Sequence, residues 1–162
     1  MKLDDIDRRL MALVQADSSL SYAAMGAEVG LSVSAVNERV RKLERGGAVK
    51  GYVAVLDPAL AGAEVLAFLE VRLPPGQGGI FSAALGGNGN VQEVHRVTGG
   101  SQYLLKLRAT DLGQLEAVVD EVEAAVPGLT RTRLTLVLAT AKETAELPIA
   151  GPAQTHPEAT GA

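Results

Sequence analysis

The sequence contains no cysteine and no tryptophan, and each absence excludes a class of site or packing. Without thiols the chain forms neither a disulfide nor a zinc centre with thiolate ligands, so we expect it to work in a reducing compartment. Its aromatic residues are three tyrosines and two phenylalanines, whereas 47% of the 162 residues are hydrophobic. The core must therefore consist mainly of aliphatic side chains.

Long apolar runs are also missing. No stretch approaches the roughly 20 apolar residues that a membrane-spanning helix needs. The N-terminal sequence MKLDDIDRRL alternates in charge and lacks the apolar segment of a secretory signal. These features predict a cytoplasmic protein without a membrane partner, and no pattern in the sequence indicates a metal or another cofactor.

The formal net charge is only −4, so the distribution of charge is more informative than its sum. Residues 1–57 contain eight basic and eight acidic side chains, whereas residues 58–162 contain seven and eleven. Within residues 32–50, five basic side chains stand against two acidic ones, a local charge of +3. This excess predicts that nucleic acid is held by one element rather than by a general basic surface.

Three short helices are expected at the N-terminal end, over residues 4–15, 21–29 and 32–45. Ser21 and Ser32 stand where an N-cap is preferred, and Gly30-Leu31 separates the second helix from the third. After Gly46-Gly47, residues 49–56 alternate as VKGYVAVL, which predicts a strand or small wing. Two helices joined by a tight turn are the arrangement that lays a recognition helix in the major groove of DNA.

The third helix has a polar face suited to contacts with bases, although an ordinary solvated face is the alternative. Val36, Val40 and Leu43 recur at helical spacing and should pack inward. Asparagine and arginine can make paired bonds to purines, glutamate can accept from cytosine, and alanine can contact a thymine methyl group. The residues expected to read bases are Ser34, Ala35, Asn37, Glu38, Arg41 and Lys42. Phosphate contacts are expected from Ser21, Ser32, Arg45 and Lys50.

The second half of the chain has a different pattern. Strands are expected over residues 65–73, 91–98, 103–108 and 131–139, and helices over residues 80–85 and 111–126. On the longer helix one face is shared by Leu112, Leu115, Val118, Val119 and Val122. The order βαββαβ is the ferredoxin-like plan. The sequence therefore predicts an α+β protein, with an N-terminal winged helix-turn-helix domain and a C-terminal ferredoxin-like βαββαβ domain.

Composition suggests how the chain is divided. Residues 1–58 form the predicted DNA-binding domain, and residues 59–64 (ALAGAE) form a linker. Residues 65–147 form the second domain. Residues 148–162 are rich in proline, alanine, glycine and threonine, so we expect a disordered tail.

Four motifs together resemble the leucine-responsive/asparagine-regulator (Lrp/AsnC, feast/famine) family: LDDIDRRLMALVQADS, VGLSVSAVNERVRKLERGGAVKGYVAVLDP, VQEVHRVTGGSQYLLKLRATDL and PGLTRTRLTLVLATAKET. The resemblance covers residues 3–147 and implies a transcriptional regulator whose second domain senses amino acids or related small metabolites. It also implies homodimers that pair through their sheets and assemble into tetramers or octamers. A two-fold dimer should bind pseudo-palindromic sites in double-stranded DNA.

The chain departs from that family in one turn. The family pattern is Gly-Asp, one residue, Asp-Tyr, whereas this chain has GGSQY at residues 99–103. The resemblance implies that this turn borders the effector cleft, so loss of both carboxylates removes a countercharge for an ammonium group. We expect a changed effector or no amino-acid response, unless the acids serve only the turn or the assembly. The predicted effector contacts are Thr98, Gly99, Gly100, Ser101, Gln102, Thr132 and Thr135.

Two competing functions remain open on the sequence. The same two-module architecture is similar to a group of haem-biosynthesis decarboxylases, in which a polycarboxylate would be bound by His95, Arg96, Tyr103, Arg131 and Arg133. A single histidine on a strand, however, is more often structural. Alternatively, the chain has lost DNA binding and assembles only with paralogous regulators, because Glu38 adds a negative charge to the expected reading face.

Overall fold

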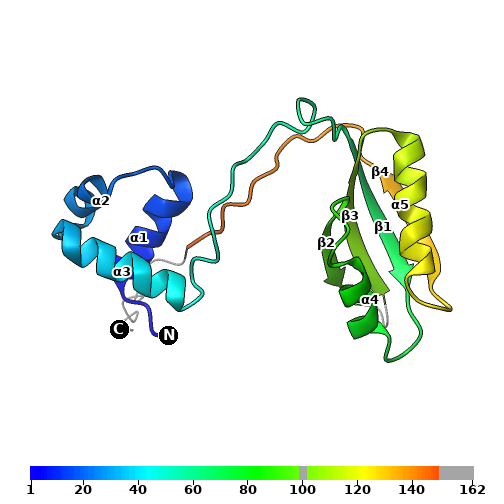
Figure 1. Ribbon diagram of the computed structural model, residues 1–162, viewed down its shortest axis with the longest axis horizontal. Coiled ribbons are helices and arrows are strands. Elements are labelled where there is room, and N and C mark those ends of the chain that lie inside the picture. Colours follow the sequence, from blue (N-terminus) through cyan, green and yellow to red (C-terminus); the bar gives the residue numbers. More distant parts are fainter. Residues whose placement is uncertain (99–101, 150–162) are drawn as a thin grey trace, which may run out of the picture. The chain divides into compact units, whose positions relative to one another are not determined.

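The computed structural model of the chain describes residues 1–98 and 102–149 (Figure 1). The chain divides into two compact units, and we name them the helical unit, Met1–Ala54 with the segment from Glu143 onward, and the sheet unit, Val55–Lys142. Residues 99–101 of the predicted effector turn and residues 150–162 of the predicted disordered tail lie outside the described residues. Within the described ranges, no helix is long and apolar enough to cross a membrane.

Three helices form the helical unit: α1 (Asp5–Ala16), α2 (Tyr22–Val29) and α3 (Val33–Arg45). Their ends agree with the predicted helices to within one residue. The inward-facing residues predicted on the third helix are confirmed, because Val36, Val40 and Leu43 are buried. The three apolar faces meet in one small core made of Leu10, Val14, Met25, Val29, Val36, Val40 and Leu43.

Side-chain caps fix where these helices begin. Both predicted serine caps are confirmed: the Ser21 hydroxyl accepts from the Ala24 N–H at 3.2 Å, and the Ser32 hydroxyl accepts from the Ala35 N–H at 3.3 Å. Each bond satisfies an N–H group that the first turn of a helix leaves without a partner. Gly30 ends α2 with φ of 71°, a left-handed conformation that glycine adopts without steric strain. This turn sets the direction of α3.

The predicted strand or wing over residues 49–56 is wrong. The described chain shows no strand there, and Val53 and Val55 are 85% and 89% exposed. A strand needs a neighbour that receives its backbone hydrogen bonds, and the sheet of the described residues contains none that pairs with this segment. The alternation of residue types was visible in the sequence, but it does not supply a pairing partner.

The sheet unit has the predicted βαββαβ order: β1 (Val65–Arg72), α4 (Gly78–Leu85), β2 (Val91–Arg96), β3 (Gln102–Ala109), α5 (Leu112–Ala124) and β4 (Thr130–Leu136). The four strands lie in the order β2-β3-β1-β4, and all neighbours are antiparallel. This is the ferredoxin-like arrangement, so the predicted fold of this half is confirmed. Helix α4 begins two residues before the predicted start.

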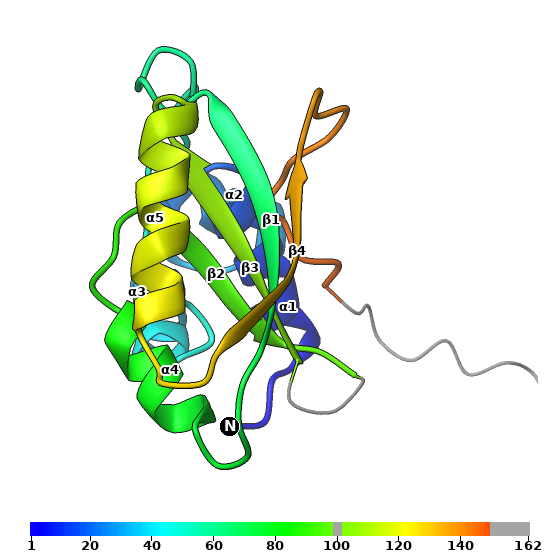
Figure 2. The same ribbon diagram turned by 90° about the vertical axis from the view of Figure 1, so that its right-hand side faces the viewer.

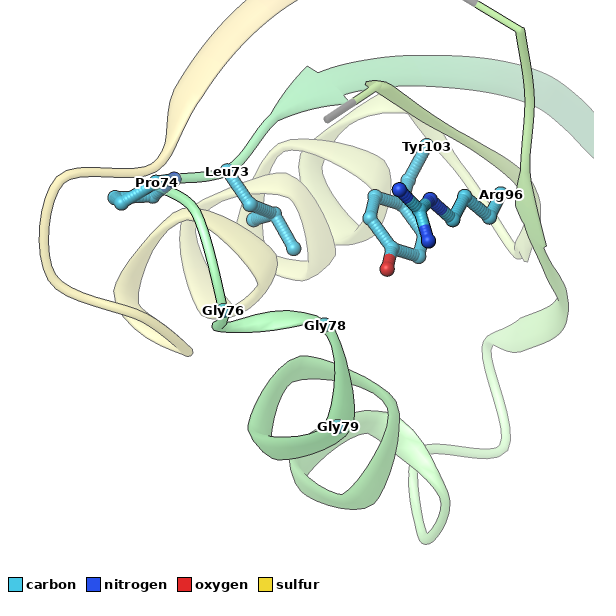
Figure 3. Close-up of a pocket in the computed structure, with 7 residues that line it drawn as sticks. All are labelled: Leu73, Pro74, Gly76, Gly78, Gly79, Arg96 and Tyr103. Carbon is cyan, nitrogen blue, oxygen red and sulfur yellow. The ribbon is translucent and has the colours of Figure 1, made fainter. Parts of the chain in front are cut away.

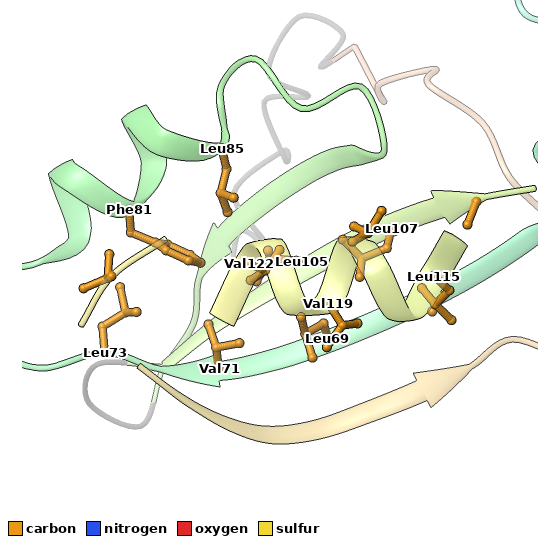
Figure 4. Packing of buried hydrophobic residues seen from close by; sticks show 14 residues of the cluster. Leu69, Val71, Leu73, Phe81, Leu85, Leu105, Leu107, Leu115, Val119 and Val122 are labelled. Carbon is orange, nitrogen blue, oxygen red and sulfur yellow. The ribbon is translucent and has the colours of Figure 1, made fainter. Parts of the chain in front are cut away.

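Both helices of this unit pack on one face of the sheet, as the view of α5 across β1 and β3 shows (Figure 2). Alternate strand residues such as Leu69, Val71 and Leu105 point into the layer between sheet and helices (Figure 4). Leu112 is an exception to the predicted helix face, because it is 62% exposed. Periodicity gives the direction of a side chain around the helix axis, but not whether the sheet extends far enough to cover it.

Candidate functional site

The polar face of α3 is open to solvent. Ser34, Glu38, Arg41 and Lys42 are exposed. Ala35 and Asn37, which lie nearer to the core residues of the same helix, are half-buried. The six predicted base-reading residues therefore lie on the outer side and the flanks of one helix, at the spacing that lets one helix present several side chains to a groove.

The residues predicted to contact phosphates are distributed around the ends of the same helices. Arg45 and Lys50 are exposed, and in the described part of the chain no acidic side chain pairs with them or with Arg41. The hydroxyl groups of Ser21 and Ser32 accept bonds as N-caps, and the Ser32 hydroxyl also lies 3.1 Å from the Ser34 hydroxyl. Helix N-termini with such donors are suited to anions.

Arg39 has a role that sequence reasoning missed. One of its guanidinium nitrogens, Nη1, lies 2.7 Å from Asp4 Oδ2 and 2.6 Å from Asp7 Oδ1, which ties α3 to the start of α1. The N–H of Asp7 and then the guanidinium of Arg39 hold the pKa of Asp4 below its ordinary value. Hydrogen bonds to the two carboxylates raise the pKa of Arg39. Arg39 therefore anchors the helix from its inner edge.

The carboxylates that meet Arg39 are held by α1 itself. The Asp7 N–H donates to Asp4 Oδ1 at 2.7 Å, and the Asp4 N–H donates to Asp7 Oδ2 at 3.2 Å, a reciprocal capping box. Asp7 is 1% exposed, although it is charged. The Lys42 ammonium lies 3.8 Å from Asp7 Oδ2, so its charge is shared with α1 rather than fully available to a ligand. The pair Asp4 and Asp7 in LDDID was the available signal for this network.

The sheet unit contains a cavity of about 290 Å³ beside the N-terminus of α4. Arg96 of β2 and Tyr103 of β3 are direct register partners, and their side chains reach the space next to the loop before α4 (Figure 3). The Tyr103 ring packs edge-on against Phe81, with 5.4 Å between ring centroids. The lining is Leu73, Pro74, Gly76, Gly78, Gly79, Arg96 and Tyr103.

The predicted effector residues that the structure describes do not line this cavity. Thr98 is exposed after the end of β2, and Gln102 begins β3 opposite Arg72. Because successive strand residues point to opposite faces, Gln102 and Tyr103 point away from each other. Thr135 lies on β4 opposite Phe68, and Thr132 is in β4 with a side chain outside the described part. The other predicted contacts, residues 99–101, also lie outside it.

The residues considered for a decarboxylase are not gathered in one place. His95 Nε2 lies 2.8 Å from Glu93 Oε2, and this bond together with Lys106 lowers the pKa of Glu93. His95 precedes Arg96 on the strand, so it points to the face opposite the cavity. Arg131 Nε of β4 lies 3.0 Å from Oε1 of Glu123, near the C-terminal end of α5. Only Arg96 and Tyr103 of the set reach the cavity.

Comparison with known proteins connects both units to one family. Residues 3–44 match the AsnC-type helix-turn-helix domain, and residues 66–147 match the Lrp/AsnC ligand binding domain. The chain belongs to the Lrp/AsnC family of transcriptional regulators. The family resemblance seen in the sequence is thereby confirmed, and so is its function as a DNA-binding regulator.

Individual relatives span nearly the whole Lrp/AsnC chain. The leucine-responsive regulatory protein of Salmonella typhimurium is 36% identical over 150 residues, 91% of this chain and 92% of the relative. The transcriptional regulator FL11 of Pyrococcus horikoshii is 32% identical over 147 residues, 91% of this chain and 97% of the relative. Both are named as regulators rather than as enzymes.

Solved structures show the same architecture. The feast or famine regulatory protein of M. tuberculosis, complexed with L-methionine, superposes with a TM-score of 0.82 at 32% identity, covering 92% of this chain and 100% of that one. A Neisseria meningitidis transcriptional regulator in complex with L-methionine gives a TM-score of 0.81 at 26% identity, covering 91% and 97%. The helix-turn-helix and ferredoxin-like plan of this Lrp/AsnC regulator is thus a shared family feature.

Proposed function

We propose that this Lrp/AsnC regulator binds its operator through the outer face of α3, with residues 1–58 as the DNA-binding domain. The proposal is carried by Arg41, whose side chain is exposed and is paired with no acidic side chain among the described residues. It lies on the same helix as Asn37 and Glu38, and Arg39 ties that helix to the start of α1. Arginine can bond a guanine edge with two donors, which discriminates between bases by about 1–3 kcal/mol. Lys50 and Arg45 would contact phosphates, which carry no sequence information.

The experiment that tests this assignment is a mobility shift with DNA from upstream of the chain's own gene. Arg41→Ala should lower affinity for the operator but leave affinity for unrelated DNA nearly unchanged. The matched change Lys50→Ala should weaken both DNAs similarly and reduce the salt slope, log K against log salt, by about 0.9. Equal effects of the two variants on every DNA would contradict the assigned roles. Absence of any shift would instead favour a protein that only assembles with paralogues.

We further propose a homodimer, with residues 65–147 as the effector-binding and oligomerisation domain and residues 59–64 as the linker. The sheet has helices on one face, and the other face presents Phe68 and Leu104 between charged side chains. A second sheet, from another copy of the chain, would cover that face. Light scattering should give at least twice the 16.8 kDa chain mass. A monomer at micromolar concentration would refute the dimer.

A two-fold dimer implies a pseudo-palindromic operator with half-sites in phase on the duplex, whether the dimer acts alone or in a tetramer or octamer. We place the regulator in the cytoplasm, where such DNA lies, and we assign it no enzymatic activity. Incubation with sirohaem tests the absence of enzymatic activity, since a decarboxylase would change the absorbance spectrum of the porphyrinoid.

We propose that a small metabolite, an amino acid or a related compound, alters DNA affinity through the sheet unit. Two relatives of the chain were solved in complex with L-methionine.

A further inference from the structure

Among the described residues, one basic side chain and no acidic side chain line the cavity of the sheet unit. Of its seven lining residues only Arg96 is charged, and within the described residues no carboxylate pairs with its guanidinium. Tyr103 adds a hydroxyl group, and the remaining lining consists of leucine, proline and glycine. A small ligand in this cavity would therefore meet hydrogen-bond donors and one positive charge, without a side chain that balances a positive group of its own.

The fold brings the two polar groups to the same face of the sheet, with Arg96 exposed. Arg96 and Tyr103 occupy one register pair of β2 and β3, so their side chains start from neighbouring positions on the same face of the sheet. The contact between the Tyr103 ring and Phe81 limits how far the ring can move. Figure 3 shows the guanidinium and the hydroxyl close to the loop that runs from Pro74 to Gly79.

Gly78 is what allows this loop to approach the tyrosine. A Cβ atom at this position would lie 2.1 Å from Tyr103 Oη, a separation that no real side chain tolerates. Any larger residue would therefore push the ring or the loop aside. Gly76 and Gly79 also line the cavity. The sequence PPGQGG shows no phosphate-binding pattern, and the close approach to Tyr103 explains why it has glycine at position 78.

We propose that this cavity binds the carboxylate of a small organic acid that lacks an ammonium group, with 2-oxo acids as the class. Arg96 would supply the charge through its forked guanidinium, and Tyr103 would donate a further bond. An α-amino acid would bring its ammonium beside the same guanidinium with no carboxylate in the lining to compensate. A cavity of about 290 Å³ suits a molecule of a few carbon atoms. The inference rests on the proposed role of the sheet unit as a metabolite sensor.

The test is calorimetric titration of the full chain with matched pairs of acids: leucine against 4-methyl-2-oxopentanoate, and glutamate against 2-oxoglutarate. We expect the oxo acid of at least one pair to bind more tightly than its amino acid. Arg96→Gln should weaken that binding about tenfold or more, because a charge-assisted bond is lost, and Tyr103→Phe should weaken it less. Arg72→Gln is the control, since Arg72 is exposed at the end of β1 and points to the opposite face. It should bind as the unsubstituted chain does.

A mobility shift without ligand, on the same preparations, separates this inference from the proposed function. The inference is overturned if the amino acids bind as tightly as the oxo acids, if no oxo acid binds, or if Arg96→Gln and Arg72→Gln have equal effects. Intact DNA binding in those cases leaves the regulator function standing. Conversely, oxo-acid binding that depends on Arg96, in a chain that binds no DNA, would support the cavity and contradict the DNA-binding role.

Discussion

The core of the helical unit has seven buried residues, whereas that of the sheet unit has fourteen. The smaller core is supplemented by charged groups: Arg39 reaches across to Asp4 and Asp7, and these two carboxylates also cap α1. The sheet unit depends instead on strand register and on apolar contacts with two helices. The difference has a reason in function, because a helix that meets DNA must keep one face polar and exposed. Such a helix is stabilised on its inner side, where ion pairs supplement the contacts of a few apolar residues.

The comparison is tested most strongly by shortening one leucine in each core. Leu43→Ala in α3 and Leu69→Ala in β1 each remove a fully buried side chain, and each should lower the free energy of unfolding by about 2–5 kcal/mol. Hydrogen exchange followed by mass spectrometry should show lost protection in residues 1–54 for the first variant and in residues 55–142 for the second. Loss of protection throughout the chain in both variants would mean that the two units do not unfold separately.

The contribution of the charged anchor is tested by Asp7→Ala. The carboxylate is 1% exposed and Arg39 is 29% exposed, so we expect a loss of about 1–3 kcal/mol rather than the larger value of a fully buried pair. DNA affinity should fall as well, because α3 is less firmly oriented. Chemical denaturation and a mobility shift measure the two effects. Asp5→Asn, at an exposed first-turn position of α1, is the control and should be nearly silent.

The end of α3 makes a pH-dependent contact with the segment that follows it. Tyr52 Oη donates to Glu44 Oε1 at 2.9 Å, and burial together with this bond raises the pKa of Tyr52 to about 12. Because folding raises this pKa, the contact contributes its full stability at pH values below 10.0, the ordinary pKa of tyrosine. That contribution is lost as the pH rises through about 12. Ultraviolet titration of tyrosinate should detect the late ionisation of Tyr52. Glu44→Gln should move its pKa toward 10.0 without reaching it, and an unchanged titration curve would contradict the contact.

The smallest expected effect concerns the C-terminal segment of the helical unit. The Gln15 side chain donates to the Leu147 carbonyl at 2.9 Å and accepts from the Leu147 N–H at 3.0 Å. Gln15→Ala should cost about 1 kcal/mol or less, because the contact is exposed. Faster amide exchange at Leu147 and earlier proteolysis after Lys142 should report its loss. Glu146→Ala leaves both bonds in place and should change neither measurement.

Much of the architecture was predictable because it depends on local patterns. The helices of the helical unit followed from apolar spacing and from serine caps, and the βαββαβ order followed from alternating and helical periods. The wing over residues 49–56 failed because pairing depends on a second segment rather than on alternation. The predicted inward position of Leu112 was wrong because helical periodicity does not say whether a neighbouring element covers the side chain. The outer face of α3 was visible in the sequence, whereas the network behind it was not, since Arg39 and Asp7 are distant in the chain.

The sequence by itself determined the class of this protein: an aliphatic, cysteine-free chain with a helix-turn-helix and a ferredoxin-like domain, recognisable as an Lrp/AsnC regulator. Local propensity, periodicity and capping act over a few residues, so they can be read without coordinates. The tertiary structure decided which charges are engaged and which are available. It joined Arg39 to the start of α1, and it brought Arg96, Tyr103 and Gly78 from three elements to one cavity, because only folding sets distances between residues that are far apart in the chain.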